Sequence, residues 1–232
     1  NIVGDFLVMV SDNEYCVNNV SSNIGSDDLP ILYNYTNITI EDQELAVLEL
    51  CGADNSSVDN VTIGSGMYII NTDGSNFTNI VSDENYYGIF NYGSNNNAFV
   101  NCSLDNNLLG VYQFDSSFNT IQNVNAGNNF FGIYSTTNQV TFGNTFDNVN
   151  ASNNTIIGIL SQWDIGGSIT DSITNSNGIY GIYVTVAGAN ISDNIANLNM
   201  IGFAPYWTLA SNFEDNTASS NTFYDFYSVL DD

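Results

Sequence analysis

A short phrase recurs along the chain and constrains its fold more than any other feature. The phrase is an apolar residue, a glycine, a second apolar residue and then usually an aromatic residue. Its glycine is first recognisable at Gly66 and then stands at positions 88, 110, 132, 158, 181 and 202, and Asp225 replaces it in the last copy. The steps between neighbouring copies are 22, 22, 22, 26, 23, 21 and 23 residues. A period in this range is typical of a solenoid, in which each repeat buries its apolar face against its neighbours.

The second half of each repeat has apolar positions of its own, mostly eleven and fourteen residues after the glycine. These apolar runs are short, show no helical stripe and are bounded by Asn, Ser, Asp and Gly, which is the pattern of strands joined by tight turns. A unit of about 22 residues is too short for two helices but suffices for about three short strands. Equivalent strands of successive repeats would then pair in parallel, roughly 4.8 Å apart.

Two copies of the phrase carry a longer motif, Asn-x-apolar-Gly-apolar-Tyr, over residues 107–112 and 129–134. This motif resembles the right-handed parallel β-helix repeat of the pectate-lyase-like superfamily and of NosD-like surface and periplasmic proteins, and the resemblance covers roughly residues 57–230. It implies an all-β fold, a right-handed parallel β-helix of about eight or nine coils with a period of about 22 residues. It says little about function, because this fold hosts lyases, hydrolases, epimerases, adhesins and structural proteins.

The first 56 residues differ in texture, because the repeated phrase is not legible there. We interpret residues 1–56 as an N-terminal cap with irregular coils, since solenoids need atypical terminal units, and residues 57–232 as one continuous domain of repeats. A separate N-terminal domain is the alternative, although a segment of this length is small for an independent core. Within the cap, residues 1–10 and 45–50 are strand candidates.

One repeat is longer than the others. The step between Gly132 and Gly158 is 26 residues, which indicates an insertion near residues 137–145. Insertions in solenoids protrude from one face as loops. The segment is therefore either a local recognition element or a surface bulge without a role, and the sequence leaves both interpretations open.

The charge composition is one-sided. The 232 residues include 25 Asp and Glu but no Lys, Arg or His, so the formal net charge is −25. Without cations the chain cannot neutralise phosphate, which excludes nucleic acid and anionic lipid as partners. No stretch approaches the roughly 20 apolar residues of a membrane span, so we expect no membrane insertion. Because the chain starts at Asn1 without an initiator Met, we expect a processed, exported protein located outside the cell, at its surface.

The same composition disfavours catalysis. Nucleophilic triads need a base such as His, and the pectate lyases that the repeat resembles hold anionic substrates with Arg and Lys, all of which are missing. Structural zinc needs more His and Cys than this chain has. We therefore expect no enzyme and no cofactor. The acidic clusters at residues 83–85 and 105–107 could contribute oxygen ligands to calcium, but neither matches a known loop, so calcium stays an unassigned option beside an ordinary turn role.

Three cysteines leave one unpaired if the protein is exported. Cys102 occupies the repeat position of Ile80, Val124 and Ile195, so we expect a buried free thiol. Cys16 and Cys51 both lie in the cap, where an intrachain disulfide would tie down the end of the solenoid. An intermolecular bond through one of them is the competing interpretation.

Asparagines also recur at one repeat position, just before the second apolar site, at Asn79, Asn101, Asn123, Asn148 and Asn194. In the resembling family such residues stack inside the solenoid as a ladder, so we expect Asn101 to stay unglycosylated although it begins an Asn-x-Ser/Thr sequon. The remaining sequons are candidate glycosylation sites. They begin at Asn19, Asn34, Asn37, Asn55, Asn60, Asn76, Asn150, Asn153 and Asn190.

Side chains alternate across a strand, which predicts that the first and third residues of the phrase point inward and that the glycine and fourth residue point outward. The fourth positions would then form an exposed column suited to packing against a second copy of the chain. This assembly stripe consists of Tyr68, Phe90, Tyr112, Tyr134, Leu160 and Tyr183.

Two functions remain open at this point. The first is a self-assembling extracellular structural protein, such as a sheath, surface-layer or filament protomer, because a chain without Lys or Arg offers no site to trypsin-like proteases. In composition and fold such a chain resembles the protease-resistant surface sheaths of archaea. The alternative is an exported carbohydrate-binding or carbohydrate-active β-helix, with glycans as partners. An ice- or mineral-binding solenoid is disfavoured, because no Thr ladder repeats at a fixed register.

Overall fold

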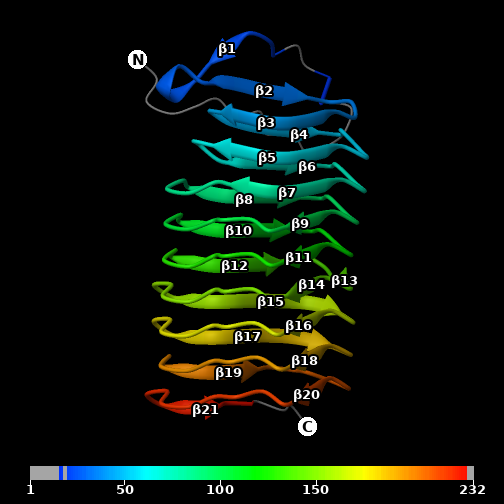
Figure 1. Ribbon diagram of the computed structural model, residues 1–232. Coiled ribbons are helices and arrows are strands. Elements are labelled where there is room, and N and C mark those ends of the chain that lie inside the picture. The colour runs from blue at the N-terminus through cyan, green and yellow to red at the C-terminus, as the bar shows by residue number, and fades with distance from the viewer. Residues whose placement is uncertain (1–15, 18–19, 229–232) are drawn as a thin grey trace.

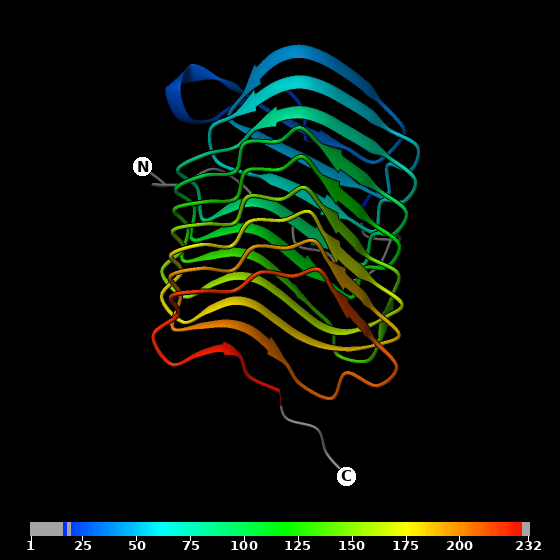
Figure 2. The same ribbon diagram turned by 60° about the horizontal axis from the view of Figure 1, so that its bottom comes forward.

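The computed structural model describes residues 16, 17 and 20–228, so the strand expected over residues 1–10 lies outside the described residues. Strands alternate between two sheets along the sequence, and each passage around the coil contributes one strand to each sheet (Figure 1). Successive coils follow nearly the same outline, which Figure 2 shows from the blue N-terminal coils to the red C-terminal coil. Apart from the 3-10 helix η2 (Ser26–Asp28), the described residues contain no helix.

Sheet A runs the length of the solenoid. In spatial order it contains β1 (Asn23–Ile24), β2 (Pro30–Asn34), β4 (Val47–Cys51), β6 (Met67–Ile70), β8 (Tyr87–Tyr92), β10 (Leu109–Phe114), β12 (Phe131–Thr136), β15 (Ile157–Ile165), β17 (Tyr180–Ala187), β19 (Ile201–Pro205) and β21 (Tyr224–Phe226). The short strand β13 (Thr141–Phe142) joins this sheet beside the end of β15. All of these pairs are parallel except β1 with β2.

Sheet B is the second face. It contains β3 (Thr39–Leu45), β5 (Ser57–Ile63), β7 (Asn76–Val81), β9 (Ala98–Val100), β11 (Thr120–Gln122), β14 (Thr145–Asp147), β16 (Ser168–Thr170), β18 (Asn190–Ser192) and β20 (Asn212–Glu214). The third strand expected in each coil is reduced to a column of single parallel bridges from Val81 to Thr217.

The pairing in sheet A confirms the repeat. The third residues of the phrase form one column, and their spacing along the sequence repeats the steps read from the glycines. The column is Met67, Ile89, Val111, Ile133, Ile159, Ile182, Phe203 and Phe226. The fold is thus an all-β parallel solenoid of about eight turns with a period of about 22 residues.

The N-terminal coils are shorter. Ile31 pairs with Val47, 16 positions on, and Leu48 pairs with Met67, 19 positions on. The strand expected over residues 45–50 is instead two strands, because Leu45 ends β3 and Val47 begins β4 in the other sheet. Both short coils nevertheless stack on the regular ones through sheets A and B.

The core lies between the two sheets. Ile89, Val111 and Ile133 face it from sheet A, and Phe77 and Phe99 face it from sheet B with their rings stacked at 4.9 Å. Similar side chains of successive coils thus stack on one another along the solenoid. Each coil buries its apolar side chains against the next.

The inward position of the glycines corrects one expectation. A Cβ atom on Gly110 would lie 2.6 Å from the Gly132 carbonyl oxygen and 2.7 Å from Asn129 Nδ2. The glycine therefore faces inward, and the first residue of the phrase lies on the outer face, where Tyr87 contacts the Phe90 ring at 5.1 Å. Strict alternation fails here because sheet A pairs Leu109 with Tyr87 and Val111 with Ile89 but leaves the glycine between them unpaired.

The expected asparagine ladder was also placed wrongly. Asn79, Asn101, Asn123 and Asn148 are exposed, so the reason given for leaving Asn101 unglycosylated is wrong. Only Asn194 is buried, and it occupies the repeat position of Cys102, whereas Ile195 pairs with Ile173 and lies exposed. Counting fourteen residues from Gly181 reaches Ile195, one position too far, because the step from Gly181 to Gly202 is only 21 residues and Ile191, which pairs with Ile169, stands ten rather than eleven residues after its glycine.

The internal ladder instead uses the asparagine at the start of the motif. The Asn107 backbone N–H donates to Asn129 Oδ1 at 2.6 Å, and Asn129 Nδ2 donates to the Leu104 carbonyl at 3.0 Å. The same backbone-to-amide bond repeats from coil to coil. The ladder consists of Asn85, Asn107, Asn129, Asn154, Asn177, Asn199 and Asn221.

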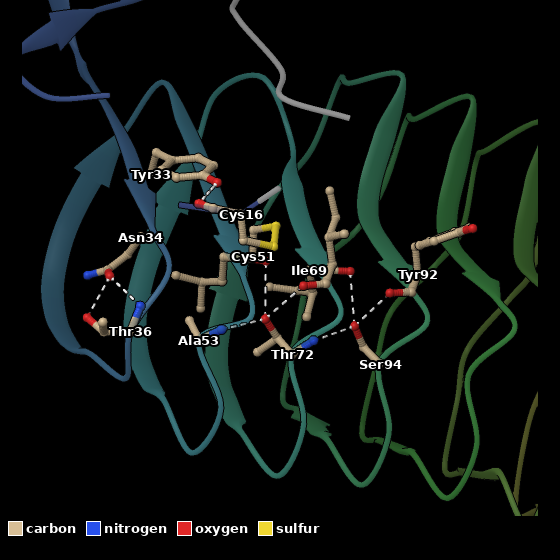
Figure 3. The surroundings of a disulfide bond; sticks show 12 residues. Cys16, Tyr33, Asn34, Thr36, Cys51, Ala53, Ile69, Thr72, Tyr92 and Ser94 are labelled. Carbon is tan, nitrogen blue, oxygen red and sulfur yellow. Dashed lines mark hydrogen bonds between the residues drawn. A yellow bond between two sulfur atoms is a disulfide. The ribbon is translucent and has the colours of Figure 1, made fainter. Parts of the chain in front are cut away.

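The cysteines behave as expected. Cys16 and Cys51 form an intrachain disulfide with a Cα–Cα distance of 5.3 Å, and the Tyr33 hydroxyl donates to the Cys16 carbonyl beside it (Figure 3). Cys102 is a buried free thiol. The disulfide attaches a segment near the N-terminus to β4, at the end of the solenoid where the coils are shortest.

Candidate functional site

The predicted assembly stripe exists as a column but is not an open apolar strip. Its six residues pair in register along sheet A. Tyr68, Phe90 and Leu160 are only 9, 5 and 6% exposed, and the other three are half-buried. The rings pack on one another and on the first residues of the phrase, as in Tyr112 with Tyr134 at 5.7 Å. Packing of a second copy against this column stays a prediction.

The sequons lie where a glycan could be attached. Asn19 lies outside the described residues. Asn34 is half-buried, and its Oδ1 accepts the Thr36 backbone N–H at 2.9 Å. The other candidates are exposed, at Asn37, Asn55, Asn60, Asn76, Asn150, Asn153 and Asn190. Their glycosylation stays a prediction.

The acidic clusters serve the turns. Asp83 Oδ1 accepts the Asp105 backbone N–H at 2.6 Å, and Asp105 Oδ1 accepts that of Gly127 at 2.7 Å. Each carboxylate thus bonds the equivalent turn of the next coil. Within residues 16–17 and 20–228, no three His, Cys, Asp or Glu side chains gather where they could hold a metal ion.

The insertion leads to a different site. Its strand β13 pairs with the last residues of β15, Thr141 with Asp164 and Phe142 with Ile165, and this extends sheet A beyond its ordinary width (Figure 1). β15 and β17 are correspondingly long. The insertion therefore builds an extra edge next to three coils, rather than a detached loop.

Trp163 projects from this widened part of the sheet. Gln162 pairs with Thr185 and Asp164 pairs with Val186, so Trp163 is an extra residue that forms a β-bulge. Its φ of 58° lies in the left-handed region, which is unfavourable for a bulky side chain. The Trp163 backbone N–H donates to Thr185 Oγ1 at 3.2 Å, which holds the bulge against the next coil.

Trp207 approaches from the other side. It follows β19, where the Tyr206 backbone N–H donates to the Val184 carbonyl at 2.8 Å. Its φ of 51° is also left-handed. The two indole rings lie two coils apart in the sequence, yet their centroids are 5.6 Å apart with an interplanar angle of 39°. They are 46 and 51% exposed and are the two tryptophans of the chain.

Together the tryptophans form an apolar cleft of about 260 Å³. This is smaller than the roughly 300–1,000 Å³ of pockets for drug-sized ligands, so it suits one ring rather than a large molecule. The side chains around it are uncharged. They belong to Val140, Trp163, Ile165, Thr185, Ala187 and Trp207.

Uncharged polar groups continue from the cleft across sheet A. Gln162 directly precedes Trp163, and its Oε1 accepts the Thr136 hydroxyl at 3.1 Å. Thr136, Gln162 and Thr185 occupy one column on successive strands, at positions where the earlier coils have Tyr92 and Phe114. The surface beside the cleft thus changes from aromatic to amide and hydroxyl.

One carboxyl group lies behind the cleft. Asp164, between Trp163 and Ile165, is 1% exposed and its Oδ2 accepts the Asn144 backbone N–H at 3.2 Å. Burial raises the pKa of this carboxyl to about 7, although hydrogen bonds from Asn144 and Thr141 oppose the shift. Because its acceptor contacts are inside the coil, Asp164 supports the cleft wall and does not line the cleft.

Sequence reasoning identified the insertion but missed the tryptophans. The available signal was that both tryptophans of an aromatic-rich chain stand outside the repeated phrase. Their closeness follows from the bulge at Trp163 and from the turn after Pro205, neither of which has a mark in the sequence.

Comparison with known proteins supports the fold. No curated protein matches the chain. Among solved structures, the A-module of the Azotobacter vinelandii mannuronan C-5 epimerase AlgE4 matches with a TM-score of 0.64 and 15% identity, over 84% of this chain and 64% of that one. The A-module of AlgE6 from the same organism matches with a TM-score of 0.55 and 12% identity, over 81% of this chain and 65% of that one.

These two likenesses concern the fold, because the identities are low and this chain spans less than two thirds of either module. The described residues contain no helix with the length and apolar character needed to cross a membrane. A model of the family described as "Periplasmic copper-binding protein (NosD)" matches residues 52–229, which is most of the chain. This match shows that the chain belongs to the NosD family.

Proposed function

We propose that this protein is an exported β-helix that binds saccharides through the cleft between Trp163 and Trp207. The observation that supports this function is the pair of half-exposed indoles, held 5.6 Å apart by two left-handed backbone positions. Left-handed non-glycine positions recur at turns throughout this solenoid, and at these two they carry the bulkiest side chains. The fold holds both bulky rings in solvent where smaller residues would be less strained.

The chemistry of the cleft suits a sugar ring. A pyranose presents an apolar C–H face, which packs on the face of an indole, and hydroxyl groups at its edge. The two indole rings can pack on the C–H face of the sugar. Thr136 and Gln162 offer hydroxyl and amide groups that can bond its hydroxyl groups. Tryptophan gives large contact area at small conformational cost, which is why it is enriched where proteins recognise ligands.

The fold relatives favour this function over the sheath hypothesis. The matched epimerase modules belong to enzymes named for mannuronan, so carbohydrate-related proteins use this architecture. The packed state of the aromatic stripe also weakens the sheath hypothesis, because its first members leave little surface for a second copy.

Copper is named in the description of the family, but the residues of this chain do not fit a copper site. The chain has no His, and Cys16 and Cys51 are joined in a disulfide. Cys102 and Met67 are buried in the core, Met9 lies outside the described residues, and the half-buried Met200 is a single thioether without His or free Cys partners. Imidazole, thiolate and thioether ligands are the groups that copper prefers. We therefore assign no role to copper.

Binding without catalysis fits the cleft best. Its lining has no titratable side chain, and Asp164 bonds inside the coil. General acid–base catalysis needs a titratable group within reach of the substrate. The family description and the disulfide are in accord with an extracytoplasmic location, where disulfides persist. We propose the cell surface as the finer location.

Calorimetric titration with a panel of oligosaccharides tests the function. Trp163→Ala and Trp207→Ala should each weaken binding at least about fivefold, because truncating a central aromatic contact usually costs more than about 1 kcal/mol. Tyr86→Ala is the matched control, since Tyr86 is 60% exposed on a coil outside the cleft. If both tryptophan variants keep their fold by circular dichroism and bind like the control, the cleft is not the binding site.

A further inference from the structure

We propose that the Trp163–Trp207 cleft selects uncharged saccharides and excludes anionic ones such as uronates. This inference rests on the saccharide-binding function proposed above. It concerns the class of ligand, which neither the fold nor the family decides.

The first reason is the lining of the cleft. A bound carboxylate needs a cation or several converging N–H donors to replace its water. The cleft offers two indoles, three aliphatic side chains and Thr185, whose Oγ1 already accepts the Trp163 backbone N–H. The indole N–H groups and the Thr185 hydroxyl can each donate one hydrogen bond, but none of these groups carries a positive charge, so a uronate would lose hydration without a cation to replace it.

The second reason is the field of the whole molecule. The chain carries 25 acidic residues and no Lys, Arg or His, so no cationic side chain can lie near the cleft. A net charge of this size gives surface potentials that repel an approaching polyanion. Like charges brought together at an interface disfavour binding.

The third reason is that recognition without charge is provided beside the cleft. The Thr136 hydroxyl and the Gln162 amide are half-buried on strands next to the tryptophans. Neutral hydroxyl and amide groups can donate to and accept from sugar hydroxyls. The column they occupy is aromatic in the earlier coils and becomes polar only here, at the coils that form the cleft.

Indole fluorescence provides the test, because the two tryptophans of the chain are the two walls of the cleft. The wild-type protein is titrated with glucose-, mannose-, galactose- and xylose-based oligosaccharides and with oligomannuronate of equal length. We expect at least one neutral oligosaccharide to change the indole emission. At low ionic strength we expect oligomannuronate to bind at least about tenfold more weakly. Added salt should narrow the gap, because it screens exposed charges.

A charge variant tests the cause. Val140 lies on the cleft wall and is 42% exposed, so its substitution does not disturb the core. Val140→Lys should raise the affinity for oligomannuronate several-fold and with it the ratio of anionic to neutral binding, whereas Val140→Gln, which alters the same wall without adding a charge, should raise neither.

The outcomes separate the two proposals. If oligomannuronate binds the wild type as tightly as the best neutral sugar, the selectivity inference is overturned but saccharide binding stands. If no saccharide changes the indole emission, the proposed function fails and the inference fails with it. If Val140→Lys leaves oligomannuronate binding unchanged, the charge explanation is overturned.

Discussion

The glycine of the phrase shows how one residue type controls this fold. At Gly110 the backbone lies against the next coil so closely that a methyl group would meet a carbonyl oxygen at 2.6 Å and the Asn129 amide at 2.7 Å. The motif Asn-x-apolar-Gly is therefore one physical unit, in which the glycine leaves the space that the ladder asparagine of the next coil fills. The motif predicted that this glycine and asparagine belong together. Strict alternation of side chains along the strand predicted wrongly that the glycine points outward.

We predict that Gly110→Ala destabilises the protein by about 2–3 kcal/mol, because overpacking displaces the backbone of a neighbouring coil. Gly64→Ala is the matched control. Its Cβ would meet nothing nearer than the Leu45 carbonyl at 3.8 Å, so we expect no loss of stability. Urea unfolding followed by circular dichroism measures both. Equal midpoints for the two variants would contradict the close approach of coils at Gly110.

Cys102 should not react with thiol reagents in the folded protein. Burial raises the pKa of its thiol to about 12, so almost no thiolate forms at neutral pH, and the sulfur is inaccessible as well. Labelling should reach one thiol per chain only after denaturation, since Cys16 and Cys51 are joined. Fast stoichiometric labelling of native protein would show that the repeat position of Cys102 is not in the core.

At the scale of elements, the regular strands of residues 57–228 could be predicted and the special ones could not. The 22-residue steps in the sequence are the steps of the pairing in sheet A, because each step is one coil. The widened strands β15 and β17 depend on the insertion, on a bulge at Trp163 and on pairing with β13. A bulge arises from tertiary contacts and leaves no periodic signal, so the cleft could not be predicted.

Asp164 lies in β15 and pairs with Thr141 of β13. We expect its titration to change the free energy of unfolding. Its folded pKa of about 7 is raised above the ordinary aspartate value of 3.8, so between these values the folded state binds a proton that the unfolded state has lost. Stability should therefore fall as pH rises from about 4 to about 7, and the loss should be complete above that range. An Asp in a salt bridge has the opposite effect, because its folded pKa is lowered and its contribution to stability is lost as pH falls.

We predict that Asp164→Asn is more stable than the wild type at pH 8 by about 2–4 kcal/mol and no more stable at pH 4. The asparagine keeps an acceptor for the Asn144 backbone N–H without a buried charge. Measuring the difference between the two proteins removes the general repulsion among the other carboxylates, which both share. A difference in stability that does not vary with pH would contradict the raised pKa.

At the scale of the whole molecule, self-assembly stays a prediction. The last coil is exposed, and Phe223, Tyr224 and Phe226 at its edge are each about half exposed or more. Unpaired edge strands are sites where chains associate. If rods instead pack side by side along the stripe, Tyr112→Ser combined with Tyr134→Ser should abolish lateral assembly in electron micrographs. If the double variant assembles like the wild type, the contact lies elsewhere. If the wild-type protein stays as dispersed monomers, neither edge association nor packing along the stripe occurs.

The composition has its clearest effect at this scale. A chain with 25 acidic residues and no basic one folds because 43% of its residues are hydrophobic and each coil buries its share against the next. That much could be read from sequence, whereas the expectation that anionic partners are excluded stays a prediction. The position of the site could not, because it depends on two residues 44 positions apart that meet across three coils.

The most direct test of the central claim is a crystal structure of the protein with a bound neutral oligosaccharide. We predict one sugar ring packed on the exposed faces of the Trp163 and Trp207 indoles, with hydroxyl groups near Thr136 and Gln162. A saccharide bound at another face, with the cleft empty, would contradict the claim.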